Sequence, residues 1–345
     1  MKAVFFQQHG GAEVLQYGEL PTPNMSGGEA MIRVEACALN HLDLWVRQGL
    51  PGVQIPMPHV SGSEIVGLVV GKGPGVRGIR VGQRVLVAPG MSCGRCTRCR
   101  IGRESLCPEF RIIGLQTNGG YAEYASVPGK NCIPVSDRWK PEEWAAVPLV
   151  FLTAWHMLVT RAELRPRERV LIHGAGSGVG SAAIQVAKLK GATVFATAGS
   201  DEKLKKARAL GADQVWNYSR VDFAQEVLKA TKGKGVHLVF EHIGPDTWAG
   251  SIRCLQKGGR LVTCGATSGP KVELDLRFFF TKELSVLGSY MGSRRELDEV
   301  LRWVNRGRLK PVVSATFPLK EAAKAQQVME SRNFFGKLVL KMEGS

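Results

Sequence analysis

The sequence predicts an α/β protein of two domains, in which a barrel or sandwich of short strands precedes a doubly wound parallel sheet. The chain has 345 residues, enough for two hydrophobic cores, because single domains usually span about 100 to 200 residues. Residues 1–149 read as short strands joined by turns rich in glycine and proline, whereas residues 150–290 alternate apolar strands with helices. Repeated strand–helix units form a parallel sheet.

The strands of the first domain are short apolar runs separated by turns. They are expected at residues 1–6, 30–36, 64–70 and 83–87. This spacing is typical of a β-barrel or a β-sandwich. Residues 291–345 are expected to hold one helix and to return to the first domain through a final strand at 337–341.

Composition excludes several classes of protein. Hydrophobic residues make up 44% and charged residues 22%, as in ordinary globular chains. No apolar run approaches the roughly 20 residues of a membrane span, and the start lacks the pattern of a secretory signal. The net charge of +16 is spread along the chain, so no nucleic-acid partner is expected. We expect a cytoplasmic protein without a membrane partner, whose positive field favours an anionic cofactor.

Four clustered cysteines are the most informative feature of the first domain. They are Cys93, Cys96, Cys99 and Cys107. Their spacing lets one lobe, residues 90–110, close around a single tetrahedral zinc ion. Four thiolates leave no coordination position for water or substrate, so the zinc is expected to be structural. The other four cysteines are scattered singly, which favours reduced thiols over disulfides.

The second domain contains a glycine-rich loop between a strand at 169–173 and a helix at 181–190. Glycines permit a sharp turn and a close approach to a pyrophosphate, whose charge the helix N-terminus stabilises. A dinucleotide is therefore expected to bind at Ala175, Gly176, Ser177, Gly178, Val179 and Gly180. The pattern continues with strands at 193–197, 236–240, 260–264 and 284–288 and a helix at 201–210.

The end of the second strand of this domain indicates the coenzyme. In NAD-binding domains an acidic residue at this position normally hydrogen-bonds to the ribose. This sequence instead has small, uncharged residues that end in Ser200, and Lys203 follows. A 2′-phosphate would meet hydroxyls and a cation, so NADP is favoured and NAD remains possible. The competing interpretation is that Lys203 lies on a solvated helix face, and Asp201 and Glu202 are close enough to weaken the preference.

Together these motifs resemble the medium-chain dehydrogenase/reductases over the whole chain. The cysteine lobe is similar to the structural-zinc lobe of the zinc-containing alcohol dehydrogenases, whereas residues 170–187 and 212–218 resemble the zinc-free quinone oxidoreductases. The resemblance implies a GroES-like β-barrel catalytic domain joined to a Rossmann NAD(P)-binding domain. It also implies a homodimer or homotetramer, to which the apolar run Phe278–Phe280 can contribute.

The resemblance also assigns residues to the cofactor. It places Tyr218 near the adenosine 2′-phosphate, although an ordinary surface tyrosine is an equally good interpretation. It places His41 and Lys337 near the cofactor phosphates.

The catalytic zinc of this family is held by a cysteine, a histidine and a second cysteine. These positions fall on Asn40, on Ser63 and near Leu149. An amide, a hydroxyl and a hydrocarbon do not replace two thiolates and an imidazole, so a catalytic zinc in the usual place is not expected. An alternative N/O metal site remains open, because four possible ligands lie close in sequence to these positions. They are His41, Asp43, His59 and Glu64.

The missing ligands point to a reaction that needs no Lewis acid. Alcohol oxidation loses the ion that stabilises the alkoxide, whereas hydride transfer to a quinone or an α,β-unsaturated carbonyl needs chiefly positioning and a hydrogen bond to the acceptor oxygen. We hypothesise that Asn40 and Trp45 orient this oxygen and that Ser63 lies in the pocket wall. For Trp45, plain apolar packing is an equally good interpretation.

Three functions therefore remain open. The first is an NADPH-dependent reductase of a small carbonyl compound or quinone that contains a structural zinc ion. The second is an alcohol dehydrogenase with substitute metal ligands. The third is a non-catalytic nucleotide-binding protein. The sequence does not identify the substrate.

Overall fold

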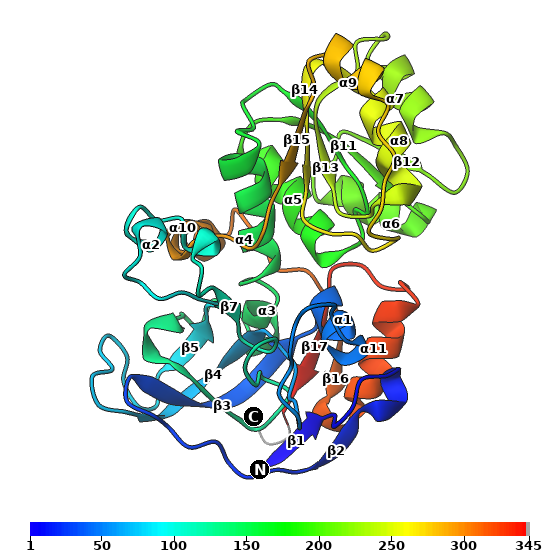
Figure 1. The fold of residues 1–345 in the computed structure, drawn as a ribbon. Helices are drawn as coiled ribbons and strands as arrows, with labels where there is room; N and C mark the ends of the chain where they lie inside the picture. Colours follow the sequence, from blue (N-terminus) through cyan, green and yellow to red (C-terminus); the bar gives the residue numbers. More distant parts are fainter. Residues whose placement is uncertain (343–345) are drawn as a thin grey trace. The chain divides into compact units, whose positions relative to one another are not determined.

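The computed structural model describes residues 1–342, which form two compact units (Figure 1). Unit 1 comprises Met1–Leu149, Ser293–Leu301 and the chain from Pro311 onward. Unit 2 comprises Val150–Gly292 and Arg302–Lys310. The sequence placed all of residues 291–345 with the first domain, whereas two short parts of this segment, 291–292 and 302–310, cluster with unit 2.

Unit 1 is built on a seven-stranded, mainly antiparallel sheet. In spatial order its strands are β16 (Val313–Pro318), β17 (Lys337–Lys341), β3 (Glu29–Ala38), β4 (Glu64–Lys72), β5 (Arg84–Val87) and β9 (Cys132–Pro134), and β8 (Tyr124–Pro128) also pairs with β3. Ile32, Ile65 and Val85, from three adjacent strands, are buried in one core. The predicted short strands are confirmed, with β3 and β4 longer than expected.

Strand register brings distant parts of the chain together at one end of this sheet. β17 pairs with β3 so that Val339 lies opposite Ala38, and β3 pairs with β4 so that Ala38 lies opposite Glu64. Continuing the first antiparallel register places Lys337 opposite Asn40, just beyond the end of β3. The predicted return of the final strand is confirmed, and it determines which side chains meet near Asn40.

The other elements of unit 1 are short. Two-stranded ribbons join β1 (Lys2–Phe5) to β2 (Gln16–Glu19) and β6 (Gly90–Met91) to β7 (Arg111–Ile112). The helices and 3-10 turns are η1 (Ala12–Val14), α1 (His41–Gln48), α2 (Thr97–Arg100), η2 (Glu104–Leu106), η3 (Gly129–Asn131), α3 (Pro141–Ala145), α10 (Arg294–Asn305), which runs on into unit 2, η5 (Leu319–Glu321) and α11 (Ala322–Glu330). The prediction of one helix near the C-terminus was wrong, because both α10 and α11 lie there. The nine-residue α11 follows directly on η5, so its periodic pattern is short.

Unit 2 contains a six-stranded parallel sheet in the order β12-β11-β10-β13-β14-β15. Its elements are α4 (Val150–Trp155), η4 (His156–Arg161), β10 (Arg169–Ile172), α5 (Gly178–Leu189), β11 (Thr193–Ala198), α6 (Asp201–Ala209), β12 (Gln214–Asn217), α7 (Phe223–Ala230), β13 (Val236–Glu241), α8 (Pro245–Arg253), β14 (Leu255–Thr263), α9 (Leu276–Thr281) and β15 (Ser285–Gly288). The strand order reverses between β10 and β13. In open parallel sheets, ligands bind beyond the carboxyl ends of the strands at such a switch point.

One helical stretch contradicts the expectation that no segment suits a membrane span. Pro141–Arg161 is 21 residues long and apolar enough to pass that test. The core helix of a folded domain passes the same test, and 72% of the apolar window is buried inside the structure. This burial favours a core helix, because a span would present its apolar side chains to lipid.

Candidate active site

The glycine-rich loop follows β10 and leads directly into α5. Gly174 has a φ of +54°, and a Cβ at Gly180 would lie 2.3 Å from the Gly174 carbonyl oxygen, so both positions require glycine. Ser177 caps the helix, because its hydroxyl accepts the Gly180 N–H at 2.9 Å. The helix therefore begins at Gly178, three residues earlier than predicted. This loop fits a dinucleotide pyrophosphate against the N-terminus of α5.

A buried polar network lies directly behind this loop. Glu241, at the end of β13, accepts the N–H groups of His242, Ile243 and Gly244 at 2.9, 2.7 and 3.3 Å. Its second oxygen accepts the Ser251 hydroxyl at 3.0 Å, and Ser251 lies 2.9 Å from His173 Nε2. This carboxylate therefore holds the β13 turn and, through Ser251, contacts the strand that leads into the glycine loop.

The imidazoles of this network are part of the loop support. Burial lowers the pKa of His173 to about 4, so its ring is neutral near pH 7. The His242 ring contacts the His173 carbonyl oxygen at 2.9 Å, and a Cβ at Gly174 would lie only 2.8 Å from that ring. The resemblance points to residues 239–244 only as backbone beside the nicotinamide, because nothing in the local pattern links side chains on different strands.

The residues predicted to surround a 2′-phosphate gather at the carboxyl end of β11. Parallel pairing sets Ala198 beside Asn217, so the following residues, Gly199 and Tyr218, are neighbours. A Cβ at Gly199 would lie 2.9 Å from the Tyr218 hydroxyl, and a Cβ at Gly176 would lie 2.9 Å from Lys203 Cδ. Lys203 thus reaches from α6 to the glycine loop. Ser200 caps α6, accepting the Lys203 N–H at 3.4 Å.

The two nearby carboxylates have cationic partners of their own. Asp201 accepts hydrogen bonds from Arg220 at 2.6 Å and from Asn217 at 3.0 Å, and Glu202 pairs with Lys206 at 2.7 Å. Their negative charges are therefore partly balanced, which reduces the objection to a phosphate at this site. Arg220 lies 19 residues from Asp201, so no local pattern in the sequence links the two.

In unit 1, Asn40, Glu64 and Lys337 form a closed polar triangle. Asn40 Nδ2 donates to Glu64 at 3.0 Å, and Lys337 Nζ donates to Asn40 Oδ1 and to Glu64, both at 2.7 Å. Lys337 Nζ also donates to the Leu39 carbonyl oxygen, and the remaining Glu64 oxygen accepts the Leu149 N–H at 2.7 Å. The exposed fraction of the Lys337 side chain is only 4%.

This geometry corrects two expectations. Lys337 has three acceptors for its three N–H bonds, so none remains for a cofactor phosphate. Both polar atoms of Asn40 are already bonded inside the protein, so donation to a substrate oxygen requires a rearrangement of its bonds to Glu64 or Ala38. The sequence could not anticipate this result, because Lys337 and Asn40 are 297 residues apart.

Ser63 and Asp43 lie beside this triangle in sequence, and each retains a polar atom without a protein partner. Ser63 Oγ and Asp43 Oδ1 are buried and lack a hydrogen bond. The other Asp43 oxygen accepts the Asn40 N–H at 2.7 Å and the Tyr121 hydroxyl at 3.0 Å. Burial raises the pKa of Asp43 to about 6. Ser63 Oγ is thus a buried polar atom able to accept or donate one further bond.

The other predicted residues of this region lie on α1. The rings of His41 and Trp45 are in edge-to-face contact with centroids 5.0 Å apart, one helical turn from each other. Both side chains are half-buried. Trp45 is therefore packed against His41.

The proposed substitute metal ligands do not come together. His59 contacts the Gly114 carbonyl oxygen at 3.1 Å, Asp43 binds Tyr121, and Glu64 binds Lys337. Within residues 1–342, only the four cysteines form a group of three or more possible ligands near enough to share an ion. The donor set around Asn40 therefore does not fit a catalytic zinc.

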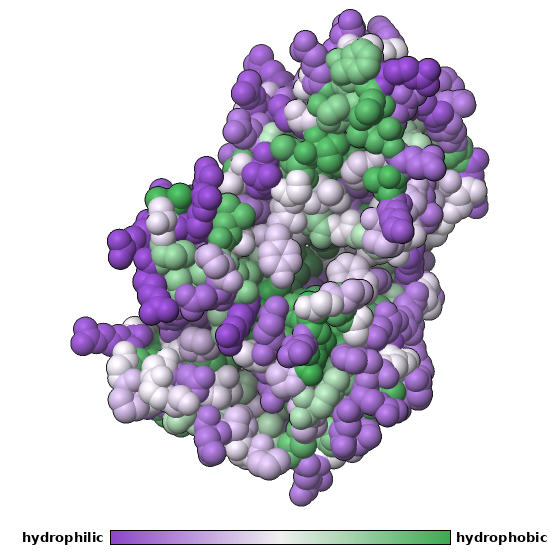
Figure 2. Space-filling model, viewed as in Figure 1, coloured by the Kyte–Doolittle hydropathy of each residue, from purple (hydrophilic) through white to green (hydrophobic). Residues whose placement is uncertain are grey.

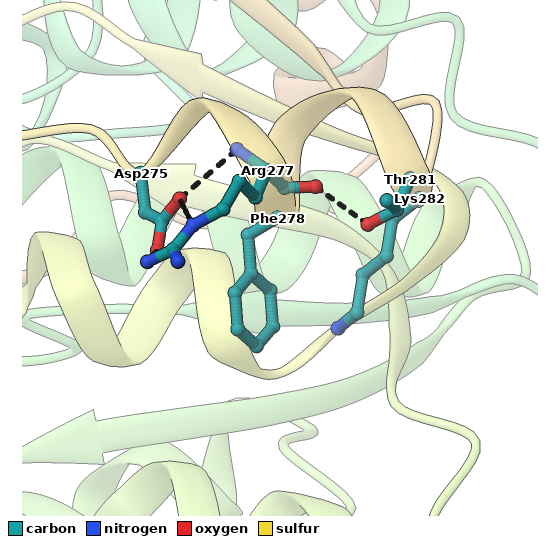
Figure 3. A pocket seen from close by; sticks show the side chains of 5 residues that line it. All are labelled: Asp275, Arg277, Phe278, Thr281 and Lys282. Atoms are coloured by element: carbon teal, nitrogen blue, oxygen red, sulfur yellow. Dashed lines mark hydrogen bonds and ion pairs between the residues drawn. The ribbon is translucent and has the colours of Figure 1, made fainter.

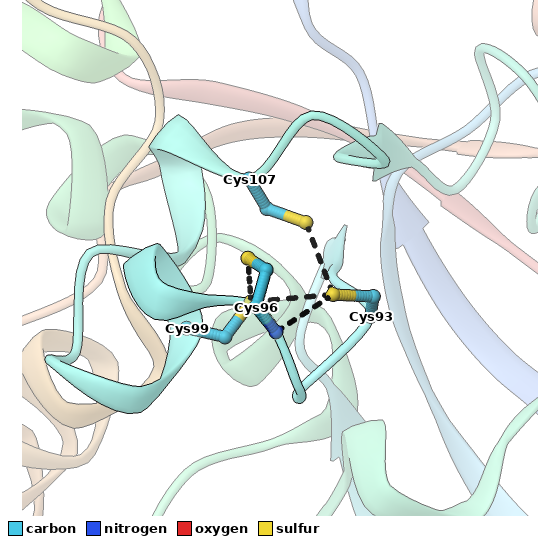
Figure 4. Close-up of side chains that lie close together, drawn as sticks. All are labelled: Cys93, Cys96, Cys99 and Cys107. Carbon is cyan, nitrogen blue, oxygen red and sulfur yellow. Dashed lines mark hydrogen bonds between the residues drawn. The ribbon is translucent and has the colours of Figure 1, made fainter.

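The four cysteines form a compact cluster (Figure 4). Their Sγ atoms lie 3.5 Å apart for Cys96 and Cys99, 3.6 Å for Cys93 and Cys107, and 3.9 Å for Cys93 and Cys99. A zinc tetrathiolate has an edge of about 3.8 Å, because Zn–S bonds are about 2.3 Å. The four thiols therefore fit a structural zinc ion.

The loop shifts the pKa values of two of these thiols in opposite directions. Hydrogen bonds from the Arg95 and Cys96 backbones lower the pKa of Cys93 to about 6, whereas burial raises that of Cys99 to about 11. β6 and β7 close the base of the loop. A bound cation is needed to make all four thiols thiolates near pH 7.

A pocket of about 460 Å³ lies elsewhere, beside α9 in unit 2 (Figure 3). Its polar groups are already engaged, because Arg277 pairs with Asp275 at 2.9 Å and Lys282 donates to the Leu255 carbonyl oxygen at 2.9 Å. None of the predicted site residues lines it. We therefore assign it no part in the reaction.

Comparisons with known proteins agree with this geometry. The alcohol dehydrogenase GroES-like domain family matches residues 26–137, and the zinc-binding dehydrogenase family matches residues 178–306. A solved NAD-dependent alcohol dehydrogenase is 46% identical over 99% of both chains, with a TM-score of 0.96. An alcohol dehydrogenase of Geobacillus stearothermophilus is 33% identical over 96% of both chains. A quinone oxidoreductase of Rattus norvegicus is 27% identical over 99% of this chain and 97% of its own.

These matches cover both units and confirm the fold predicted from the sequence. The barrel-type sheet of unit 1 is the GroES-like domain, and the parallel sheet of unit 2 is a Rossmann domain. The chain therefore belongs to the medium-chain dehydrogenase/reductase superfamily and is an NAD(P)-dependent oxidoreductase.

Proposed function

We propose that this protein reduces a quinone, an enone or a related carbonyl compound with NADPH, and that its zinc is structural only. The observation that carries the proposal is the donor set at the three catalytic-zinc positions, Asn40, Ser63 and Leu149. Two of them are bonded to Glu64, and Asn40 also accepts from Lys337. A reaction that depends on positioning and hydrogen bonding suits this site better than one that depends on a Lewis acid.

Residues of both units take part in the proposed mechanism. Reduced nicotinamide, when bound, supplies the hydride. In unit 2, the loop from Ala175 to Gly180 binds the pyrophosphate and the Glu241 network holds that loop in place. In unit 1, we assign donation to the carbonyl oxygen to the buried hydroxyl of Ser63, because it has no protein partner whereas the amide of Asn40 is already engaged. Trp45 and His41, whose rings are in contact, are proposed to line the substrate side of α1.

The coenzyme preference rests on the end of β11. Ser200, Lys203 and Tyr218 surround a position where no unpaired carboxylate opposes a phosphate. NAD is the second candidate, because the similar solved dehydrogenase is described as NAD-dependent. Titration of both reduced coenzymes by fluorescence decides between them: NADPH is expected to bind more tightly, and tighter binding of NADH would overturn the preference.

One experiment tests the function as a whole. Zinc content is measured on the same preparation that is assayed with quinones, enones, aldehydes and alcohols. One zinc per chain together with NADPH-dependent quinone or enone reduction supports the proposal. Two zinc ions with alcohol oxidation would support a zinc-dependent alcohol dehydrogenase instead. Tight NADPH binding without any turnover would identify a non-catalytic nucleotide-binding protein.

We also propose a homo-oligomer, either a dimer or a tetramer, located in the cytoplasm. Figure 2 shows apolar side chains gathered over the part of unit 2 where Figure 1 places α9. Leu276 and Phe280 are each 66% exposed there, and Val286 lies on β15, the last strand of its sheet. An edge strand beside exposed apolar residues suits pairing with a second copy of the chain.

A further inference from the structure

The Asp201 carboxylate lies against the end of β12, next to the strand end where the adenosine ribose is expected. Its Oδ1 accepts the side-chain N–H of Asn217 at 3.0 Å, and parallel pairing sets Asn217 beside Ala198, the last residue of β11. The acidic residue that holds the ribose in NAD-binding domains normally stands at the end of this strand. Asp201 comes later, as the first residue of α6, but its side chain turns back towards the strand ends.

Contacts in the turn after β12 fix the two donors that hold Asp201. The Ser219 N–H donates to Asn217 Oδ1 at 3.0 Å, so the amide nitrogen of Asn217 is the atom that faces Asp201. The Arg220 N–H donates to the Asn217 carbonyl oxygen at 3.0 Å, and the Arg220 guanidinium donates to Asp201 Oδ2 at 2.6 Å. One neutral amide and one cation therefore hold this carboxylate.

Asp201 retains the capacity to bind a hydroxyl of a coenzyme. A carboxylate offers about four acceptor positions, and the hydrogen bonds from Asn217 and Arg220 use two of them. The Asp201 side chain is 59% exposed, so part of its surface is open to a ribose hydroxyl. NADH carries such a donor at its 2′-position, whereas NADPH carries a phosphate there.

Arg220 determines how this carboxylate acts on a phosphate. An unpaired carboxylate would repel the 2′-phosphate of NADPH, but the Arg220–Asp201 pair has no net charge. Ion pairs as exposed as this one add little to stability, so the fold does not depend on it. The pair therefore offers an acceptor to a hydroxyl without presenting a net negative charge to a phosphate.

We propose that Asp201 accepts the ribose 2′-hydroxyl of NADH and that Arg220 balances its charge when NADPH binds, so that one site takes both coenzymes. Asp201 is then a specificity-determining residue, and Arg220 is a positioning residue that acts through Asp201. The proposed contacts to the phosphate itself are those of Lys203 and Tyr218. The inference rests on the proposed function, in which NADPH is the preferred coenzyme and NADH the second candidate.

The test measures the binding of NADH and NADPH to variants of the full chain by fluorescence titration, without substrate. In Asp201→Asn, NADH should bind about fivefold more weakly, because a neutral acceptor replaces a charged one, and NADPH should bind no more weakly than before. In Arg220→Gln, NADPH should bind several-fold more weakly, because the carboxylate is then unpaired. The NADH affinity of Arg220→Gln should be retained.

The double variant separates an action through Asp201 from a direct contact between Arg220 and the phosphate. If Arg220 acts through Asp201, adding Arg220→Gln to Asp201→Asn should leave NADPH affinity unchanged. A loss of NADPH affinity that persists in this background would overturn the proposal, because Arg220 would then touch the phosphate itself. So would an Asp201→Asn protein whose NADH affinity is unchanged or falls no further than its NADPH affinity.

A matched control excludes a general effect of surface charge. Glu202→Gln removes the other carboxylate in the first turn of α6, one that is 76% exposed and pairs with Lys206 at 2.7 Å, so both coenzymes should bind nearly as before. Tm should change little in every variant, because Asp201 and Arg220 are both exposed. If Glu202→Gln weakens NADH binding as much as Asp201→Asn does, the assignment of Asp201 is wrong.

These outcomes are independent of those that test the proposed function. The titrations need no substrate, so a protein without turnover would still show them. Tighter binding of NADH than of NADPH by the unaltered protein would reverse the coenzyme preference, yet Asp201→Asn would still have to weaken NADH binding selectively.

Discussion

The proposed preference for NADPH depends on two residues, Lys203 and Tyr218. Lys203 lies against the glycine loop, and Tyr218 is 44% exposed beside Gly199. In the proposed complex both side chains contact the 2′-phosphate of NADPH, whereas the ribose hydroxyl of NADH offers them no charge. The proposed preference therefore rests on two side chains, one on α6 and one after β12, and not on the glycine loop itself.

Replacing Lys203 by alanine should weaken NADPH binding about tenfold and leave NADH binding nearly unchanged. A charge-assisted hydrogen bond contributes about 1.5 kcal/mol or more, which corresponds to about that factor. Fluorescence titration with both coenzymes measures the effect. Lys205→Ala, which removes an exposed lysine from the same helix, is the matched control. Equal losses for NADPH and NADH would show that Lys203 does not recognise the 2′-phosphate.

His173 should make the protein less stable as the pH falls from about 6.5 towards 4. Burial lowers the pKa of the folded-state imidazole to about 4, while the unfolded chain titrates near 6.5. Between these values the unfolded state binds a proton that the folded state does not, so acidification favours unfolding. Tm measured across this range should fall more steeply in the unaltered protein than in His173→Gln. Parallel slopes would contradict the assignment.

At the scale of elements, the loop before α5 and the cysteine lobe show how local geometry limits substitution. The first depends on backbone packing between Gly174 and Gly180, and the second on sulfur atoms spaced for a metal. Both segments are short, so the packing of a large hydrophobic core does not hold either of them in its conformation. Each therefore depends on a few residues that cannot be exchanged.

Substitution of the two loop glycines should have unequal effects. In Gly180→Ala the new Cβ meets the Gly174 carbonyl oxygen at 2.3 Å, so the backbone must move, and both Tm and NADPH affinity should fall. In Gly176→Ala the nearest atom is Lys203 Cδ, at the end of a flexible side chain, so Tm should change little. Thermal unfolding of both variants provides the measurement, and equal losses would count against this account of the loop.

Serine at Cys99 should remove zinc and lower Tm by several degrees before it affects chemistry. Binding of a structural metal contributes directly to folding free energy, and a serine hydroxyl does not replace the thiolate. Zinc analysis and thermal unfolding measure the result. Thr97→Ala, an exposed substitution in the same lobe, is the control and should retain the ion. A zinc-free Cys99→Ser protein with unchanged Tm would refute the structural role.

At the scale of the whole molecule, the apolar surface of unit 2 is the interface of the proposed homo-oligomer. Phe280→Glu should lower the mass measured by light scattering towards that of the 37.5 kDa chain, because burying a carboxylate in an interface is unfavourable. Val81→Glu, another exposed apolar position but in unit 1, should leave the mass unchanged. An unaltered protein that is already monomeric would contradict the proposal.

The sequence by itself determined the two-domain α/β fold, the cysteine cluster and the glycine loop. Each depends on a pattern of neighbouring residues. These patterns are the hydrophobic periodicity of strands and helices, the spacing of the metal ligands, and the glycines of one turn. Only the tertiary structure decided that Lys337 lies with Asn40 and Glu64, that Arg220 neutralises Asp201 and that Glu241 supports the loop. These contacts join residues on different strands and helices. Strand register creates them, and register depends on how a whole sheet packs rather than on any local pattern.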